Sequence, residues 1–202
     1  MTLQHSTAPV LVTGASGYIA SWVIQKLLTQ GYTVHATVRD LNKSQSYTHL
    51  EQIADSSPGT LKLFEANLLK PGSFDAAMQG CEIVFHMASP FVVTNYKDAL
   101  KDIIEPAILG TQNVLNSVNK TESVQRVIVT SSIASTYGDA IDILQTEHTS
   151  FDESHWNTTS SEIHQPYPYS KVMAERKAWE MAEAQDRWDL VCINPALVFG
   201  QS

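Results

Sequence analysis

The stretch that decides the fold is Val10-Leu11-Val12-Thr13-Gly14-Ala15-Ser16-Gly17-Tyr18-Ile19-Ala20. It combines a short apolar strand, a turn with the spacing Gly14-x-x-Gly17-x-x-Ala20, and the start of a helix. Glycines let the backbone turn tightly and approach a phosphate, while the helix N-terminus offers N–H groups and partial positive charge. Ala20 still permits close packing of helix on strand. The stretch predicts a pyrophosphate site, although such a turn can also be purely structural.

The residues of this turn that we expect to bind a dinucleotide are Gly14, Ser16, Gly17, Tyr18 and Ile19. Which dinucleotide is bound depends on the end of the second strand, where NAD-binding proteins place an acidic residue for the ribose hydroxyls. Here Val38 holds that position and Arg39 follows, and a guanidinium can grip a 2′-phosphate through paired hydrogen bonds. Lys43 would add charge, whereas Asp40 could accommodate a free ribose hydroxyl. The pattern favours NADP(H).

Apolar runs of strand length alternate with segments of helical period along the chain. We expect strands at 10–12, 33–38, 61–65, 81–87, 124–130 and 189–194, and helices at 18–30, 44–55, 71–79 and 98–119. Pro106 lies inside the last helix, where a kink or a break is expected. This alternation predicts an α/β protein with a doubly wound Rossmann fold and a parallel sheet of about six strands.

The composition is that of one globular domain, which we place at residues 1–202. A net charge of −8 argues against nucleic acid or an anionic membrane as the main partner. Cys81 and Cys192 lie in apolar runs and are typical of reduced core cysteines, which favours a cytoplasmic protein without a metal site. Neither a signal peptide nor a membrane-spanning run is expected. The segment 138–165 is polar and aperiodic, and is either a functional loop near the active site or an exposed crossover.

A second motif is Tyr167-Pro168-Tyr169-Ser170-Lys171. Tyr167 and Lys171 are four residues apart, so a helix places them on one face, where the ammonium is expected to favour the phenolate and lower the pKa of Tyr167. The spacing is common by chance and is weak evidence alone. The fifth strand ends in Ser131-Ser132 at the carboxyl edge of the sheet, where ligands bind in open α/β folds. A hydroxyl there could bind a substrate carbonyl, or simply form a strand-end turn.

Together these motifs resemble the extended short-chain dehydrogenase/reductase superfamily, within the epimerase/dehydratase group. The branch that the chain is most similar to contains dihydroflavonol reductases, cinnamoyl-CoA reductases and ketone reductases. The resemblance runs from about residue 9 to residue 200. The stretches that carry it are Val12–Trp22, Ala36–Asp40, Val84–Pro90, Arg126–Ser132, Phe151–Ser154, Tyr167–Lys171 and Asn194–Gly200.

The resemblance implies an NADP-dependent oxidoreductase that acts on a small-molecule carbonyl through Ser132, Tyr167 and Lys171. Lys171 would hold the nicotinamide ribose and lower the pKa of Tyr167, which would protonate the carbonyl oxygen that Ser132 polarises. Tyr169 lacks this role, because Met173 stands four residues after it. The remaining residues that the resemblance places at the cofactor are Asn67 and Leu68 by the adenine, Met87, Ala88 and Ser89 along the cofactor, and Pro195 to Val198 by the nicotinamide.

Relatives in this branch run well beyond the length of this chain and add a small substrate domain, which is largely absent here. We therefore expect exposed apolar surface, an open strand edge, weak NADP(H) binding and poor carbonyl reduction. The substrate and the oligomeric state stay open. Two alternatives remain, an NAD-dependent nucleotide-sugar epimerase or dehydratase and a non-catalytic dinucleotide-binding protein.

Overall fold

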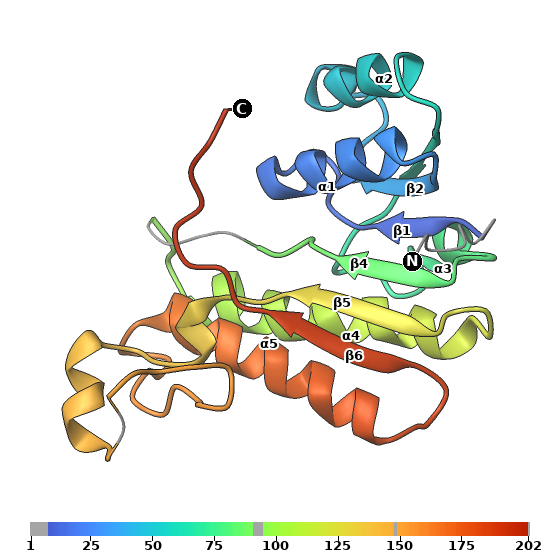
Figure 1. Cartoon of the computed structure of the whole chain (residues 1–202). Coiled ribbons are helices and arrows are strands. Elements are labelled where there is room, and N and C mark those ends of the chain that lie inside the picture. Colours follow the sequence, from blue (N-terminus) through green and yellow to red (C-terminus); the bar gives the residue numbers. More distant parts are fainter. Residues whose placement is uncertain (1–7, 91–94, 148, 202) are drawn as a thin grey trace.

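A computed structural model, which describes residues 8–90, 95–147 and 149–201, contains one parallel six-stranded sheet (Figure 1). Its strand order is β3-β2-β1-β4-β5-β6, the order of a doubly wound dinucleotide-binding fold. The strands are β1 (Val10–Val12), β2 (Thr33–Val38), β3 (Thr60–Glu65), β4 (Ile83–His86), β5 (Arg126–Thr130) and β6 (Asp189–Ile193). Every neighbouring pair is parallel, so all carboxyl ends share one edge of the sheet. The predicted fold class is confirmed.

Helices cover both faces of the sheet. They are α1 (Tyr18–Thr29), α2 (Thr48–Asp55), α3 (Asp75–Met78), α4 (Glu105–Lys120) and α5 (Pro166–Glu183). Successive side chains of a strand point to opposite faces, and β1 divides its residues accordingly. Val10 and Val12 pack in the core beneath α1 and α2, whereas Leu11 packs in the core beneath α3, α4 and α5.

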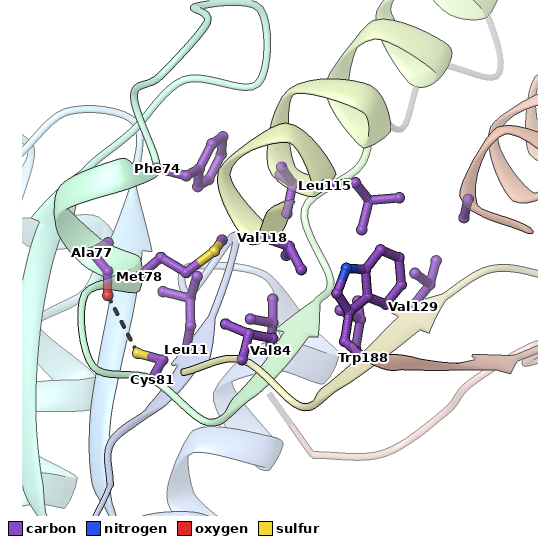
Figure 2. Close-up of a cluster of buried hydrophobic side chains, with 14 of the residues drawn as sticks. Leu11, Phe74, Ala77, Met78, Cys81, Val84, Leu115, Val118, Val129 and Trp188 are labelled. Carbon is purple, nitrogen blue, oxygen red and sulfur yellow. Dashed lines mark hydrogen bonds between the residues drawn. The ribbon is translucent and has the colours of Figure 1, made fainter. Parts of the chain in front are cut away.

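The second of these cores is shown in Figure 2, where Leu11, Val84 and Val129 of the sheet meet Leu115 of α4 and Trp188. These side chains come from five different segments of the chain, so their burial joins β1, β4, β5, α4 and the residue just before β6 in one core. Trp188 donates from Nε1 to Asn119 Oδ1 at 2.9 Å, which satisfies its polar atom inside the core.

Arg187, next to that tryptophan, closes the C-terminal end of α4. Its guanidinium donates to the carbonyl oxygens of Val118 (2.7 Å), Thr121 (2.8 Å) and Val124 (2.7 Å). The last carbonyls of a helix have no partners within the helix, and a cation there also interacts favourably with the helix dipole. Arg187 therefore ties α4 to the loop that leads into β5.

The expected helices at 71–79 and 98–119 differ from the observed ones. Only Asp75–Met78 is α-helical in the first, because Gly72 has a positive φ of 75° and the chain before Asp75 forms turns. In the second, a π-helical turn over Leu100–Ile104 precedes α4, and Pro106 lies in the first turn of α4. Proline lacks an N–H, so it is tolerated where helical N–H groups have no partner. The chain nevertheless stays helical from Ala99 to Lys120, so the irregularity expected at Pro106 takes the form of a π-helical turn and not of a break.

The segment 138–165 is mostly irregular, with one short 3₁₀ helix over Ala140–Gln145. Its base is closed by Gln165, whose Nε2 donates to Asp139 Oδ1 at 2.6 Å and whose Oε1 accepts from Ser160 Oγ at 2.9 Å. Gln165 has a left-handed backbone with φ of 56°, which is unusual for a residue with a side chain. α5 begins at the next residue, so this strained residue joins the loop to the helix that carries Tyr167.

β6 lies at one edge of the sheet, and its Val191 and Ile193 are 37% and 50% exposed. From its end the chain continues in extended form toward α1, as the red segment of Figure 1 shows. Trp22 of α1 donates from Nε1 to the carbonyl of Gln201 at 3.1 Å and fixes the end of that path. Among the helices in the described part of the chain, none is both long and apolar enough to cross a bilayer.

Candidate active site

The candidate residues from the sequence gather along the carboxyl edge of the sheet. They follow the ends of β1 (Gly14 to Ile19), β2 (Arg39, Lys43), β3 (Asn67, Leu68), β4 (Met87, Ala88, Ser89), β5 (Ser132) and β6 (Pro195, Val198), or lie on α5 (Tyr167, Lys171). The strand order reverses between β1 and β4, because β2 and β3 extend the sheet on one side and β5 and β6 on the other. Ligands of open α/β sheets bind at such a point.

At this reversal point Thr13 joins β1 to the end of β4. Its buried Oγ1 accepts hydrogen bonds from the backbone N–H groups of Met87 (3.0 Å) and Ala88 (2.9 Å) and lies 3.1 Å from His86 Nδ1. Because the oxygen already accepts twice, the hydroxyl hydrogen is directed to Nδ1 of a neutral imidazole. His86 is 3% exposed, and burial together with the charge of Lys171 lowers its pKa to about 4.

Gly14 is required where the glycine turn passes the end of β4. It has φ of 69°, and a Cβ on it would lie 2.8 Å from the Cα of Ala88. Its N–H donates to Thr37 Oγ1 at 3.3 Å, and the N–H of Ala15 donates to the carbonyl of Thr37 at 2.9 Å. The turn is therefore held by β2 and β4 together, and its shape depends on the missing side chain.

The N-terminus of α1 has the properties of an anion site. Gly17 is its N-cap, no side chain caps the helix, and its first turn contains no acidic residue. Ser16 and Gly17 are exposed beside it. A helix of twelve residues that begins in this way leaves backbone N–H groups and a partial positive charge for a phosphate. The turn thus fits the pyrophosphate that the sequence predicts.

The residues expected around the adenosine half are spread more widely. Arg39 is exposed after β2, and Lys43 Nζ lies 4.0 Å from Asp40 Oδ2. Asn67 turns its side chain back on the chain, since its Oδ1 accepts from the N–H of Leu69 at 2.9 Å. Leu68 is held against α4, where Asn113 Nδ2 donates to its carbonyl at 2.7 Å. These residues follow β2 and β3 and thus lie along the sheet edge on one side of the glycine turn.

Ser132, Tyr167 and Lys171 are brought together by β5 and α5. Ser132 and Tyr167 hydrogen-bond through their side chains. Lys171 Nζ donates to Ser89 Oγ at 3.0 Å and lies 5.7 Å from the centre of the Tyr167 ring. The serine, the phenol and the ammonium thus meet beside the segment that follows β4, next to the glycine turn.

Burial is the main cause of the pKa shifts of Lys171 and Tyr167. Lys171 is 7% exposed, and burial lowers its pKa to about 8, while the charge of Glu175 raises it. Burial raises the pKa of Tyr167, and its hydrogen bond to Ser132 lowers it by less. The pKa of Tyr167 is therefore raised overall, contrary to the expected lowering, because removal of the phenol from water outweighs its hydrogen bond to Ser132.

A buried carboxylate under this group was not found from the sequence. Glu175 is 7% exposed and lies one helical turn after Lys171 on α5. Its Oε2 accepts from Ser131 Oγ, Ser135 Oγ (2.5 Å) and Asn194 Nδ2 (3.0 Å). The available signal was its spacing, because Tyr167, Lys171 and Glu175 recur every four residues on one face.

The segment after β6 forms the far side of the site. The carbonyl of Pro195 accepts from the N–H of Ile133 at 2.9 Å, which places Pro195 beside the Ser132 turn. Val198 is 47% exposed and lines a hollow of about 430 Å³ together with Tyr18, Ile19 and Trp22 of α1. Within the described residues, no three histidine, cysteine, aspartate or glutamate side chains gather in a way that could hold a metal ion.

The fold and the glycine turn together define a dinucleotide-binding α/β protein. Its sequence matches the model of the NAD dependent epimerase/dehydratase family over residues 10–202, and the chain belongs to that family. The predicted resemblance is confirmed.

Its curated relatives include plant reductases. The chain is 45% identical over 194 residues to cinnamoyl-CoA reductase CAD2 from Medicago truncatula, which covers 95% of this chain and 58% of the relative. It is 39% identical to anthocyanidin reductase from Arabidopsis thaliana, covering 100% of this chain and 59% of the relative. The chain thus spans less than two thirds of the length of these relatives.

Solved structures of similar fold include two complexes with NADPH. Gre2 from Candida albicans has a TM-score of 0.79 and 30% identity, over 96% of this chain and 59% of that one. The yeast methylglyoxal/isovaleraldehyde reductase Gre2 has a TM-score of 0.78 and 30% identity, over 95% of this chain and 58% of that one.

Proposed function

We propose that this chain is the cofactor-binding and catalytic part of an NADPH-dependent carbonyl reductase. The observation that carries the proposal is the meeting of Ser132, Tyr167 and Lys171 beside the glycine turn, at the reversal point of the sheet. Membership of the epimerase/dehydratase family and the names of the relatives support it, since they are reductases that use related folds.

Each of the three side chains has a role that follows from its position. The Ser132 hydroxyl donates to the carbonyl oxygen of the substrate and holds it beside the Tyr167 hydroxyl. Tyr167 transfers its proton to that oxygen as the carbonyl carbon is reduced. Lys171 orients the bound cofactor by donating to its ribose, and its positive charge stabilises the phenolate that Tyr167 leaves. The nicotinamide of NADPH supplies the hydride when it is bound.

The preference for NADPH is assigned to the end of β2. Arg39 is exposed there, and Val38 occupies the position where an acidic residue would bind a ribose hydroxyl. A 2′-phosphate would be bound by the Arg39 guanidinium, with Lys43 nearby on the same loop. The two relatives of known structure that are complexes with NADPH support this preference.

The substrate class that we propose is a small aldehyde or ketone. The yeast methylglyoxal/isovaleraldehyde reductase suggests this class, because both compounds in its name are small carbonyl compounds. The loop 138–165 would supply one wall of the pocket, because Gln165 at its end leads directly into α5 and Tyr167. A hollow of about 180 Å³ lies at this loop, lined by aromatic side chains such as Tyr137 and Phe151 and by polar side chains such as Asp142 and Thr159.

The test is a panel of aldehydes and ketones assayed with NADPH and with NADH, on the wild-type chain and on Tyr167→Phe. We expect NADPH to be preferred, binding of NADPH to survive in Tyr167→Phe, and reduction to collapse. Binding and turnover that prefer NADH would favour the epimerase or dehydratase alternative. Cofactor binding with no reduction in the wild type would favour a non-catalytic protein.

A further inference from the structure

Three residues of α5 form one stripe that faces the sheet, and each meets a serine that follows a strand. Tyr167, Lys171 and Glu175 are successive members at intervals of four. Tyr167 hydrogen-bonds Ser132, Lys171 donates to Ser89, and Glu175 accepts from Ser131. The first two belong to the proposed reaction, whereas the proposed mechanism leaves the third without a role.

Glu175 is surrounded by groups that can donate to it. Oε2 is bonded by Ser131, Ser135 and Asn194, and Oε1 accepts from Trp179 Nε1 at 3.4 Å. All these partners carry a hydrogen on the atom that faces the carboxylate, which is the environment of an ionised acid. A buried carboxylate is costly unless it is paired or hydrogen-bonded in this way. A glutamate on the surface would avoid this cost, so the burial of Glu175 indicates that its carboxylate has a role in the site.

The same partners fix the backbone of Ser132. The Ser132 carbonyl accepts from the N–H of Ser135 at 2.9 Å and lies 2.7 Å from Ser135 Oγ and 3.2 Å from Asn194 Nδ2. Ser131, on its other side, is held by the carboxylate directly. Movement of Glu175 would therefore release the turn that presents the Ser132 hydroxyl to Tyr167.

We propose that Glu175 is a positioning residue, whose single carboxylate holds the Ser132 turn against the end of β6 and places a buried negative charge one helical turn from Lys171 on the same face of α5. The inference rests on the proposed reductase function and assigns to it a part that contacts neither substrate nor cofactor. Two of the three reacting side chains would then depend on one buried group.

The charges around Lys171 can be named from each element packed on it. His86 faces it from β4 and is neutral above about pH 4, while Tyr167 and Glu175 face it from α5. Cys192 of β6 faces Glu175, and burial together with that carboxylate raises its thiol pKa, so it stays neutral. Glu175 is the negative charge in this set, and it opposes the burial that lowers the pKa of Lys171 to about 8.

The first measurement needs neither cofactor nor turnover. The chain is labelled with ¹³C-lysine, the Lys171 signal is assigned by its loss in Lys171→Arg, and its titration is followed by NMR. We expect the midpoint to move to lower pH in Glu175→Gln, because the amide keeps the shape and removes the charge. Glu180→Gln is the matched control, since Glu180 is exposed on the same helix and pairs with Lys177. Equal midpoints in both variants would overturn the proposal.

The second measurement is the pH profile of carbonyl reduction with NADPH. The alkaline limb should move to lower pH in Glu175→Gln and stay in place in Glu180→Gln, since the ammonium fraction falls about tenfold for each pH unit above its midpoint. An unmoved limb in Glu175→Gln would contradict the assignment. A wild-type chain that neither binds NADPH nor reduces a carbonyl would refute the proposed function, and the NMR titration would still decide the role of Glu175.

Ser131→Ala tests the positioning role if Glu175→Gln does not fold. This variant removes one donor to the carboxylate and leaves every charge in place. We expect kcat to fall about tenfold or more, because Ser132 loses its placement, with KM for NADPH unchanged. An unchanged kcat would overturn the positioning role.

Discussion

Thr13 Oγ1 lies 3.1 Å from Nδ1 of His86, so the central strand β1 and its neighbour β4 are joined by side chains where the strand order reverses. The same oxygen accepts the N–H groups of Met87 and Ala88. The hydroxyl of Thr13 therefore holds the Met87-Ala88 segment, which lines the candidate cofactor site. Substituting Thr13, Gly14 and His86 one at a time should separate the contribution of this region to stability from its contribution to cofactor binding.

Thr13→Val should destabilise the chain by about 2 kcal/mol or more, because it keeps the shape of the side chain but leaves two backbone N–H groups without their acceptor. Thr13→Ser keeps the hydroxyl and should lose much less. Urea unfolding of the two variants measures the difference. Equal losses would mean that the hydroxyl does not support the Met87-Ala88 segment.

Gly14→Ala should be more damaging than Gly31→Ala, although both residues have positive φ, 69° and 86°. A Cβ at Gly14 would meet Ala88 at 2.8 Å, whereas a Cβ at Gly31 has nothing within 4 Å. Gly31→Ala should thus show only the backbone cost of about 1 kcal/mol. Thermal unfolding and NADPH titration check this, and Gly14→Ala should lose cofactor binding as well as stability.

Stability should fall as the pH is lowered from 6.5 toward 4, partly through His86. Its pKa is about 4 when folded and near 6.5 when unfolded, so only the unfolded chain binds the proton in this window. The contribution, about 3 kcal/mol, is complete above pH 6.5 and is lost toward pH 4. His35, whose pKa burial also lowers, adds to the slope.

The variant that checks this is His86→Asn, which still offers an acceptor to the Thr13 hydroxyl but does not titrate. Urea unfolding between pH 4 and 6.5 should show a flatter dependence than in the wild type. A slope that persists in full in His86→Asn would assign the dependence to other groups.

Arg187→Lys should destabilise the chain by about 1 to 3 kcal/mol, since one ammonium cannot reach the three carbonyls that the guanidinium bonds. The matched control is Arg126→Lys, whose exposed pair with Asp189 should contribute far less. Denaturant unfolding compares the two. Similar losses would contradict the view that Arg187 closes the end of α4.

The strands were predictable because each is an apolar run, and β2 begins and ends at the predicted residues Thr33 and Val38. The ends of the helices were less predictable. The turn at Gly72 and the π-helical turn before Pro106 depend on tertiary packing that periodicity does not contain. The expected exposure along one strand edge is seen at Val191 and Ile193 of β6.

The meeting of Ser132, Tyr167 and Lys171 could be predicted from motif order, because parallel strands bring their carboxyl ends to one edge. The pKa values of Tyr167 and Lys171 could not be predicted, because they depend on burial and the spacing of residues in the sequence contains no information on burial. Glu175 was missed for a related reason. A glutamate in a helix is usually a solvated residue, and only the fold reveals that this one faces Ser131.

The left-handed Gln165 has a consequence for how this protein could change over time. Its side chain fastens the two ends of the 138–165 loop to each other through Asp139 and Ser160, directly before the helix that carries Tyr167. Substitutions in the outer part of the loop can therefore accumulate without displacing the phenol. A new substrate preference could arise there while the machinery for proton transfer is inherited unchanged.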